Sequence, residues 1–84
     1  MEQYLATFHT HLSAMLTCQA LQAAGAQARM MPVPRALSSS CGTCVRYAAD
    51  GDCRALLDRD WEALYAEEAG RYRLLAAAED DDIR

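Results

Sequence analysis

The spacing of hydrophobic residues changes several times along this chain, and these changes constrain the fold more than any other feature. Four segments read as strands, because apolar residues alternate along them or fill them. These segments are residues 3–8, 26–34, 43–49 and 71–77. Two further segments, residues 11–24 and 53–68, place apolar residues at helical spacing. The predicted order of elements is therefore β-α-β-β-α-β.

Turn and cap residues support this division of the chain. Thr10 is a suitable N-cap for the first helix, and Gly25 is a natural C-terminal stop. Asp52 can cap the second helix, and Gly70 can end it. The apolar stripe of that helix would consist of Leu57, Trp61, Leu64 and Tyr65. Right-handed crossovers then place both helices on one face of a four-stranded antiparallel sheet, which is the ferredoxin-like α+β arrangement.

The length and composition indicate one small folded domain. The chain has 84 residues, of which 52% are hydrophobic, and no linker divides it. We expect the domain to span residues 1–78. The acidic residues 79–84, EDDDIR, read as a solvated tail. A sheet of this size is also compatible with a homodimer, because the core of so short a chain is small.

The distribution of charge excludes one class of partner. The net charge is −4, and the eight basic residues, all arginines, are scattered among twelve acidic residues. A protein that tracks phosphates along a nucleic acid needs a net basic face, so we expect no nucleic-acid partner. No apolar run approaches the roughly 18–20 residues that span a bilayer, so we expect no membrane partner.

The N-terminus predicts the compartment. The first ten residues, MEQYLATFHT, lack the basic start and long apolar run of a secretory signal. We therefore expect a cytoplasmic protein, in which thiols are kept reduced. The four cysteines then read as nucleophiles, ligands or packing residues rather than as a disulfide framework.

The segment PVPRALSSSCGTC, residues 32–44, carries the strongest chemical signal. Gly42 follows Cys41 and allows a backbone conformation that other residues resist. Ser39 and Ser40 precede the cysteine and could turn their hydroxyls onto an anionic sulfur. Arg35 could add positive potential in the same loop. Because donors and cations stabilise a thiolate, these residues are typical of an activated cysteine at Cys41.

Other interpretations of the cysteines stay open at this point. Cys41 and Cys44 form a CxxC pair that could act as a redox dithiol, although the residues after Cys44 look like a strand and not a helix. Zinc would need two more ligands. The further candidates are His9, His11, Cys18 and Cys53, and the predicted topology places the histidines at the opposite end of the sheet from Cys41. A plain interaction module, in which the cysteines bind nothing, is a third alternative.

The chain resembles the small selenium/sulfur carrier-like domain family. The resemblance rests on a strand ending in FHTH, a helix, Gly25, and the segment PVPRALSSSCG at residues 32–42. The layout is similar over roughly residues 4–76, although only that segment is specific. A second thiol at Cys44 departs from the family pattern, in which many members have an aliphatic residue.

The resemblance implies a carrier function. Cys41 would hold sulfur or selenium as a persulfide or selenosulfide and pass it to an acceptor protein. The donor would be a protein such as a cysteine desulfurase, and no cofactor is expected. Arg35, Ser39, Ser40 and Gly42 would form the surroundings of the loaded sulfur. Cys44 could act as a resolving thiol that releases sulfide by forming a disulfide with Cys41.

Overall fold

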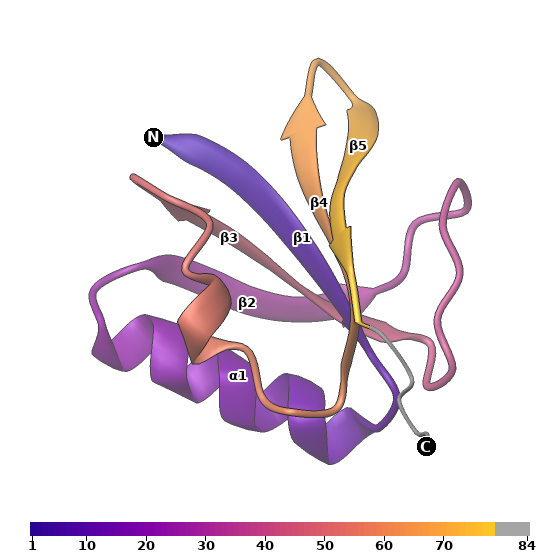
Figure 1. Cartoon of the computed structure of the whole chain (residues 1–84), viewed down its shortest axis with the longest axis horizontal. Helices are drawn as coiled ribbons and strands as arrows, with labels where there is room; N and C mark the ends of the chain where they lie inside the picture. The colour runs from indigo at the N-terminus through magenta and orange to yellow at the C-terminus, as the bar shows by residue number, and fades with distance from the viewer. Residues whose placement is uncertain (79–84) are drawn as a thin grey trace.

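Five strands form one antiparallel sheet, and a single α-helix covers one of its faces (Figure 1). This is a computed structural model, and it describes residues 1–78. The elements in chain order are β1 (Glu2–Phe8), α1 (His11–Ala23), β2 (Gln27–Pro32), β3 (Thr43–Ala49), the short 3₁₀ helix η1 (Arg54–Leu56), β4 (Trp61–Glu68) and β5 (Arg71–Ala77). The predicted tail at residues 79–84 lies outside the described residues.

The strands lie in the order β2-β3-β1-β4-β5, so β1 occupies the centre of the sheet. Both β1 and β2 pair antiparallel with β3, which lies between them. β1 and β2 therefore run in the same direction, and α1 connects them. As a result, the segments that follow β1 and β2 emerge at the same end of the sheet (Figure 1).

The first helix forms where the sequence predicts it. The Thr10 side chain accepts a hydrogen bond from the backbone N–H of Ser13 at 3.0 Å and caps the helix. Gly25 adopts a φ of +93° just beyond the helix, which is a conformation that glycine tolerates best. Ala14, Cys18 and Leu21 form the face of α1 that packs on the sheet.

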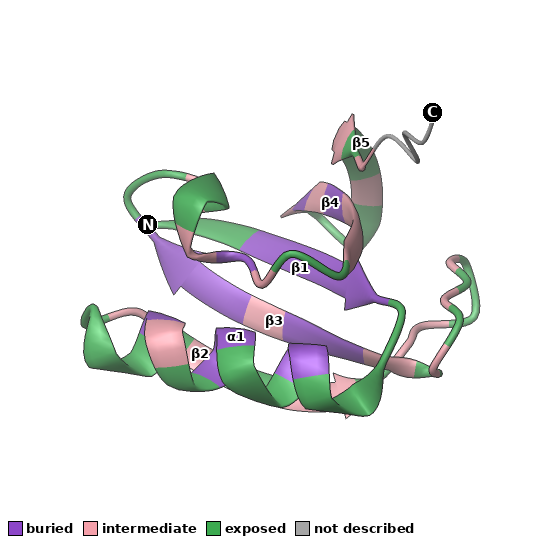
Figure 2. Cartoon of the chain, turned by 60° about the horizontal axis from the view of Figure 1, so that its bottom comes forward, coloured by how far each residue is buried: buried purple, intermediate pink, exposed green. Residues whose placement is uncertain are grey.

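The hydrophobic core lies between α1 and one face of the sheet, and Figure 2 shows the buried residues concentrated in β1, β3 and the inner side of α1. Tyr4 of β1 and Tyr47 of β3 stack there, with ring centroids 5.3 Å apart. Phe8 and Leu64 are fully buried beside them. Burial of a large apolar side chain contributes about 1.5–3 kcal/mol, so this layer stabilises the domain.

The prediction of a second helix at residues 53–68 is wrong. Only Arg54–Leu56 form a single 3₁₀ turn, and Trp61–Glu68 form strand β4 beside β1. The stripe at Leu57, Trp61 and Leu64 fits helical spacing, but WEALYAEE also alternates, with Leu64 and Ala66 pointing into the core. Without β4 the central strand would be an unpaired edge, so sheet pairing overrides the local helix preference of Ala, Glu and Leu.

Gly70 belongs to a hairpin and not to the end of a helix. Ala69 and Gly70 have φ values of +51° and +79°, and they form the two-residue turn that joins β4 to β5. Two successive positive φ values characterise the turn type that suits the twist of a hairpin. The fold is therefore a five-stranded antiparallel sheet with one helix, and the ferredoxin-like arrangement with four strands and two helices is overturned.

Two contacts from α1 hold the segment between η1 and β4. The Ser13 hydroxyl donates to the Asp58 carboxylate at 2.7 Å, and the backbone N–H of Asp58 donates to the Thr17 hydroxyl at 2.8 Å. Both hydroxyl residues are buried, so these bonds satisfy polar groups inside the domain. Within residues 1–78, no helix is both long enough and apolar enough to cross a membrane.

Candidate functional site

The loop that carries Cys41 meets the β1–α1 junction at one end of the sheet. This loop, residues 33–42, follows β2, and it projects beyond the sheet at the right of Figure 1. His9 and His11 lie close to it, which corrects the expectation that the histidines and Cys41 occupy opposite ends. The parallel strands β1 and β2 bring the segments that follow them together, and the predicted β-α-β order already implies this arrangement.

Ser39 anchors the cysteine loop to the central strand. Its hydroxyl donates a hydrogen bond to the carbonyl oxygen of Phe8, the last residue of β1, at 3.1 Å. The hydroxyl oxygen of Ser39 in turn accepts a bond from the backbone N–H of Cys41 at 3.3 Å. The sulfur of Cys41 lies 3.9 Å from this oxygen. One hydroxyl therefore connects the end of β1, the backbone of Cys41 and its thiol.

Cys41 lies half-buried at the rim of the domain. Its side chain packs against the edge of the core cluster, and its thiol donates to the carbonyl oxygen of Thr43 at 3.5 Å. The thiol therefore has two oxygen atoms within 4 Å and still retains a solvent-facing surface. Its partial exposure leaves the thiol accessible to a group on another molecule.

Gly42 gives the loop its return into β3. Its φ is +73°, in the left-handed region, and its carbonyl oxygen accepts a bond from the backbone N–H of Val33 at 3.1 Å. Apart from its two chain neighbours, no atom lies within 4 Å of a Cβ built at this position. The positive φ is therefore the reason that this position favours glycine.

Ser40 makes a separate set of contacts, directed away from the thiol. Its backbone N–H donates to one oxygen of the Glu62 carboxylate at 3.1 Å, and its hydroxyl donates to the other. The Nδ1 atom of His9 lies 3.4 Å from the Ser40 hydroxyl and 3.3 Å from Glu62. Ser39 thus fastens the loop to β1, and Ser40 fastens it to β4.

Two more groups near the loop differ in their contacts. The ring of His11 lies 3.4 Å from the Thr43 hydroxyl, measured from its Nδ1 atom. The side chain of Arg35 is exposed, and within residues 1–78 it forms no ion pair. Its guanidinium group is therefore free to meet a molecule that approaches the loop.

Cys44 occupies a different environment from Cys41. It is fully buried on the sheet face that points away from α1, and its thiol donates to the carbonyl oxygen of Pro32 at 3.8 Å. Burial, with a smaller contribution from the neighbouring Cys41, raises the pKa of the Cys44 thiol to about 11. At neutral pH this thiol stays protonated, which makes it a poor nucleophile.

The other two cysteines lie elsewhere, and all four are free thiols. Cys18 is buried in α1, and desolvation raises the pKa of its thiol. Cys53 lies beyond the far end of β3, half-buried, with a φ of +53°. Among residues 1–78, no group of three or more His, Cys, Asp or Glu side chains is arranged to hold a metal ion.

Comparison with known proteins agrees with the resemblance that the loop sequence suggests. Residues 3–58 match the family described as "Putative Se/S carrier protein-like". The chain belongs to this family. The matched residues include β1 from its second residue, α1, β2, the whole cysteine loop and β3, and they end before β4.

A relative with a longer alignment is "Uncharacterized protein YtiA" of Escherichia coli (strain K12). It is 30% identical over 82 residues, and the alignment covers 90% of this chain and 92% of the relative. No solved structure gives a significant match.

The residues that the sequence analysis singled out therefore lie in different surroundings. Ser39 and Gly42 lie beside Cys41, Ser40 faces Glu62, and Arg35 is exposed. Sequence reasoning missed Glu62 because it assigned that residue to a helix. It also missed the carbonyl oxygen of Phe8 as an anchor. An alternating interpretation of WEALYAEE would have predicted a strand at Glu62, although not its position beside β1.

Proposed function

We propose that the protein carries sulfur or selenium on Cys41, as a persulfide or selenosulfide, and delivers it to a protein partner. Membership of the Se/S carrier-like family supports a carrier function in general. The observation that carries the assignment to Cys41 is the contrast within the CxxC pair. Cys41 is half-buried in a loop at the rim, whereas Cys44 is fully buried with a raised pKa.

Loading is a transfer of sulfane sulfur between thiols. The Cys41 thiol first loses its proton to solvent. The thiolate then attacks the terminal sulfur of a persulfide on the donor, such as a cysteine desulfurase, and a new S–S bond forms on Cys41. The S–S bond of the donor breaks, and its electron pair leaves with the donor thiolate. The exchange needs no external oxidant or reductant, and selenium can take the terminal position.

Ser39 is the group best placed to assist this exchange. In the thiol form, Cys41 donates to the Thr43 carbonyl oxygen, which would repel an anionic sulfur. The Ser39 hydroxyl, 3.9 Å away, can turn its proton from the Phe8 carbonyl oxygen toward the thiolate or persulfide. The exposed Arg35 adds positive potential in the same loop and would favour approach of an anionic persulfide. Delivery is the reverse exchange, with an acceptor thiolate attacking the terminal atom.

The geometry argues against the CxxC redox alternative. The Cys44 side chain lies on the sheet face opposite α1, whereas Cys41 packs against the core cluster on the helix side. A disulfide between them would also require ionisation of a buried thiol whose pKa is about 11. Cys44 is therefore better described as a residue of the sheet interior than as a resolving thiol.

Intact mass spectrometry tests the proposal. The protein is incubated with a cysteine desulfurase and cysteine, and its mass is measured without reductant. We expect the wild type and a Cys53→Ser control to gain one sulfur, about 32 Da, and a Cys41→Ser variant to gain none. A Cys41→Ser variant that still gains sulfur would contradict the assignment. A loss of two hydrogens without added sulfur would favour the redox dithiol.

A further inference from the structure

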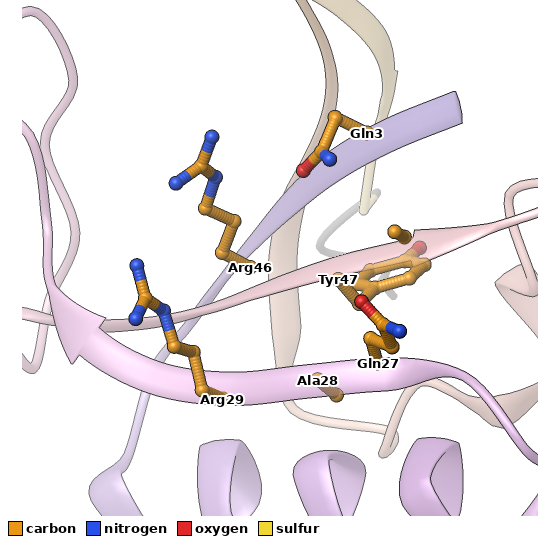
Figure 3. A pocket seen from close by; sticks show the side chains of 7 residues that line it. Gln3, Gln27, Ala28, Arg29, Arg46 and Tyr47 are labelled. Carbon is orange, nitrogen blue, oxygen red and sulfur yellow. The ribbon is translucent and has the colours of Figure 1, made fainter. Parts of the chain in front are cut away.

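A groove on the sheet face opposite α1 contains two arginines that directly oppose each other. Arg29 of β2 and Arg46 of β3 are cross-strand partners in the antiparallel register. Both line an open groove of about 360 Å³, together with Gln3 and Gln27. Figure 3 shows the two guanidinium groups projecting from neighbouring strands to the same side of the sheet.

This arrangement works against the stability of the sheet. Like charges on directly opposed residues of neighbouring strands destabilise the pair, because their Cβ atoms lie only about 5 Å apart. Arg46 is compensated by a two-point ion pair, in which Nε and one terminal nitrogen donate to Glu67 at 2.8 and 3.0 Å. Arg29 is exposed, and it forms no ion pair within residues 1–78.

The lining of the groove indicates the charge of its ligand. No Asp or Glu is among the described residues that line it, although the whole chain has a net charge of −4. Glu67 engages one edge of the Arg46 guanidinium group and fixes its orientation. The groove therefore offers many N–H donors, which favour a ligand rich in oxygen acceptors. They are the remaining donors of Arg46, the guanidinium group of Arg29 and the two glutamine amides.

We propose that this groove binds the phosphate group of a small molecule. Planar guanidinium groups match the spacing of phosphate oxygens and bind them through paired, charge-assisted hydrogen bonds. The groove is larger than one phosphate ion, so an organic substituent fits beside the glutamines. The site lies on the face opposite the Cys41 side chain, and it extends beyond the carrier function proposed for Cys41.

A titration with inorganic phosphate tests the site. Backbone amide NMR shifts are followed while phosphate replaces chloride at constant ionic strength. We expect saturable shifts at Gln3, Gln27 and their strand neighbours. Arg29→Gln should weaken binding about tenfold or more, because it removes one charged fork without breaking an existing ion pair. Arg71→Gln, an equal charge change at an exposed residue of edge strand β5, is the matched control and should leave binding within about twofold.

Glycerol phosphate and a nucleoside monophosphate distinguish the two sources of the phosphate group. Tighter binding of an ester than of the free ion would show that the groove also contacts the organic part. Equal binding would show that it recognises the phosphate group alone. Either result supports the site. Shifts that do not saturate, equal effects of Arg29→Gln and Arg71→Gln, or a preference for acetate over phosphate would overturn the proposal.

Discussion

Two half-buried cysteines lie beyond opposite ends of β3, and their surroundings differ. Cys41, before the strand, has a serine hydroxyl 3.9 Å from its sulfur and a carbonyl oxygen at 3.5 Å. Cys53, after the strand, borders a cavity lined by residues such as Ala24, Ala26 and Ala49, and within residues 1–78 its thiol has no hydrogen-bond partner. Exposure alone does not distinguish the two thiols. Their polar neighbours do, because only Cys41 has a hydroxyl that can donate to an ionised sulfur, and we therefore assign the proposed exchange to Cys41.

The largest expected effect is a pH-dependent loss of stability caused by Cys44, the buried neighbour of Cys41. The pKa of Cys44 rises from 9.0 to about 11 on folding. Below about pH 9 the thiol is protonated in both states, and its contribution to stability is complete. As the pH rises through 11, the unfolded chain ionises more readily, so the free energy of unfolding falls by about 3 kcal/mol.

Urea denaturation of the wild type and Cys44→Ala, from about pH 8 to about pH 11, measures this loss. The substitution removes a buried side chain and lowers stability at every pH, so the slope with pH is the informative quantity. We expect a steeper decline in the wild type. Parallel curves would show that the Cys44 thiol ionises as easily in the folded protein as in the unfolded chain.

The glycines in the segments at the two ends of β3 should respond differently to substitution. Gly42→Ala places a Cβ on a residue with a φ of +73°, which costs about 1–2 kcal/mol although no atom beyond the two adjacent residues lies within 4 Å of it. Gly51→Ala is the matched control, since Gly51 has no positive φ and equally open space. Thermal denaturation of both variants checks this, and equal losses would contradict the conformational role of Gly42.

Ser39→Ala should loosen the cysteine loop. It removes the bond to the Phe8 carbonyl oxygen and the acceptor for the Cys41 N–H, and we expect a loss of about 1 kcal/mol. Sulfur loading should also slow, because the hydroxyl nearest the sulfur is gone. The adjacent Ser38→Ala is the control, because Ser38 is exposed. If both variants load at the wild-type rate, Ser39 does not assist the exchange.

The smallest effect is expected for Arg35→Ala. This exposed side chain forms no ion pair within residues 1–78, so stability should be unchanged, while loading by an anionic donor persulfide slows by roughly two- to fivefold. Arg59→Ala, also exposed, controls for the loss of one charge. Initial rates at low and high salt are the measurement, and the difference should vanish at high salt. A rate difference that persists at high salt would contradict an electrostatic role.

The sequence predicts the first part of the fold well, because its local signals agree with the tertiary structure. Thr10 and Gly25 define α1, and alternation defines β1 and β3. The prediction for residues 53–68 is wrong because their composition favours a helix locally, whereas pairing with the edge of β1 favours a strand. Gly70 cannot decide between the two structures, because a glycine that ends a helix and a glycine in a hairpin turn both adopt a positive φ.

The candidate site is predictable only in its local part. Ser39, Cys41 and Gly42 are near neighbours in sequence, so a loop around the thiol can be inferred from the chain itself. The contacts with His9 and Glu62 depend on the parallel course of β1 and β2 and on the position of β4. The predicted β-α-β order already implies the parallel course of β1 and β2. The position of β4 does not follow from local patterns, so the contact of Ser40 with Glu62 is seen only in the three-dimensional structure.

Peptide mapping of the loaded protein tests the central claim most directly. After incubation with a desulfurase and isotopically labelled cysteine, trypsin cleavage after Arg35, Arg46 and Arg54 separates residues 36–46 from residues 47–54. The first peptide contains Cys41 and Cys44, and the second contains Cys53. We predict that the labelled sulfur is found in residues 36–46, with fragment ions placing it on Cys41. Label on Cys53 or Cys44 would contradict the account.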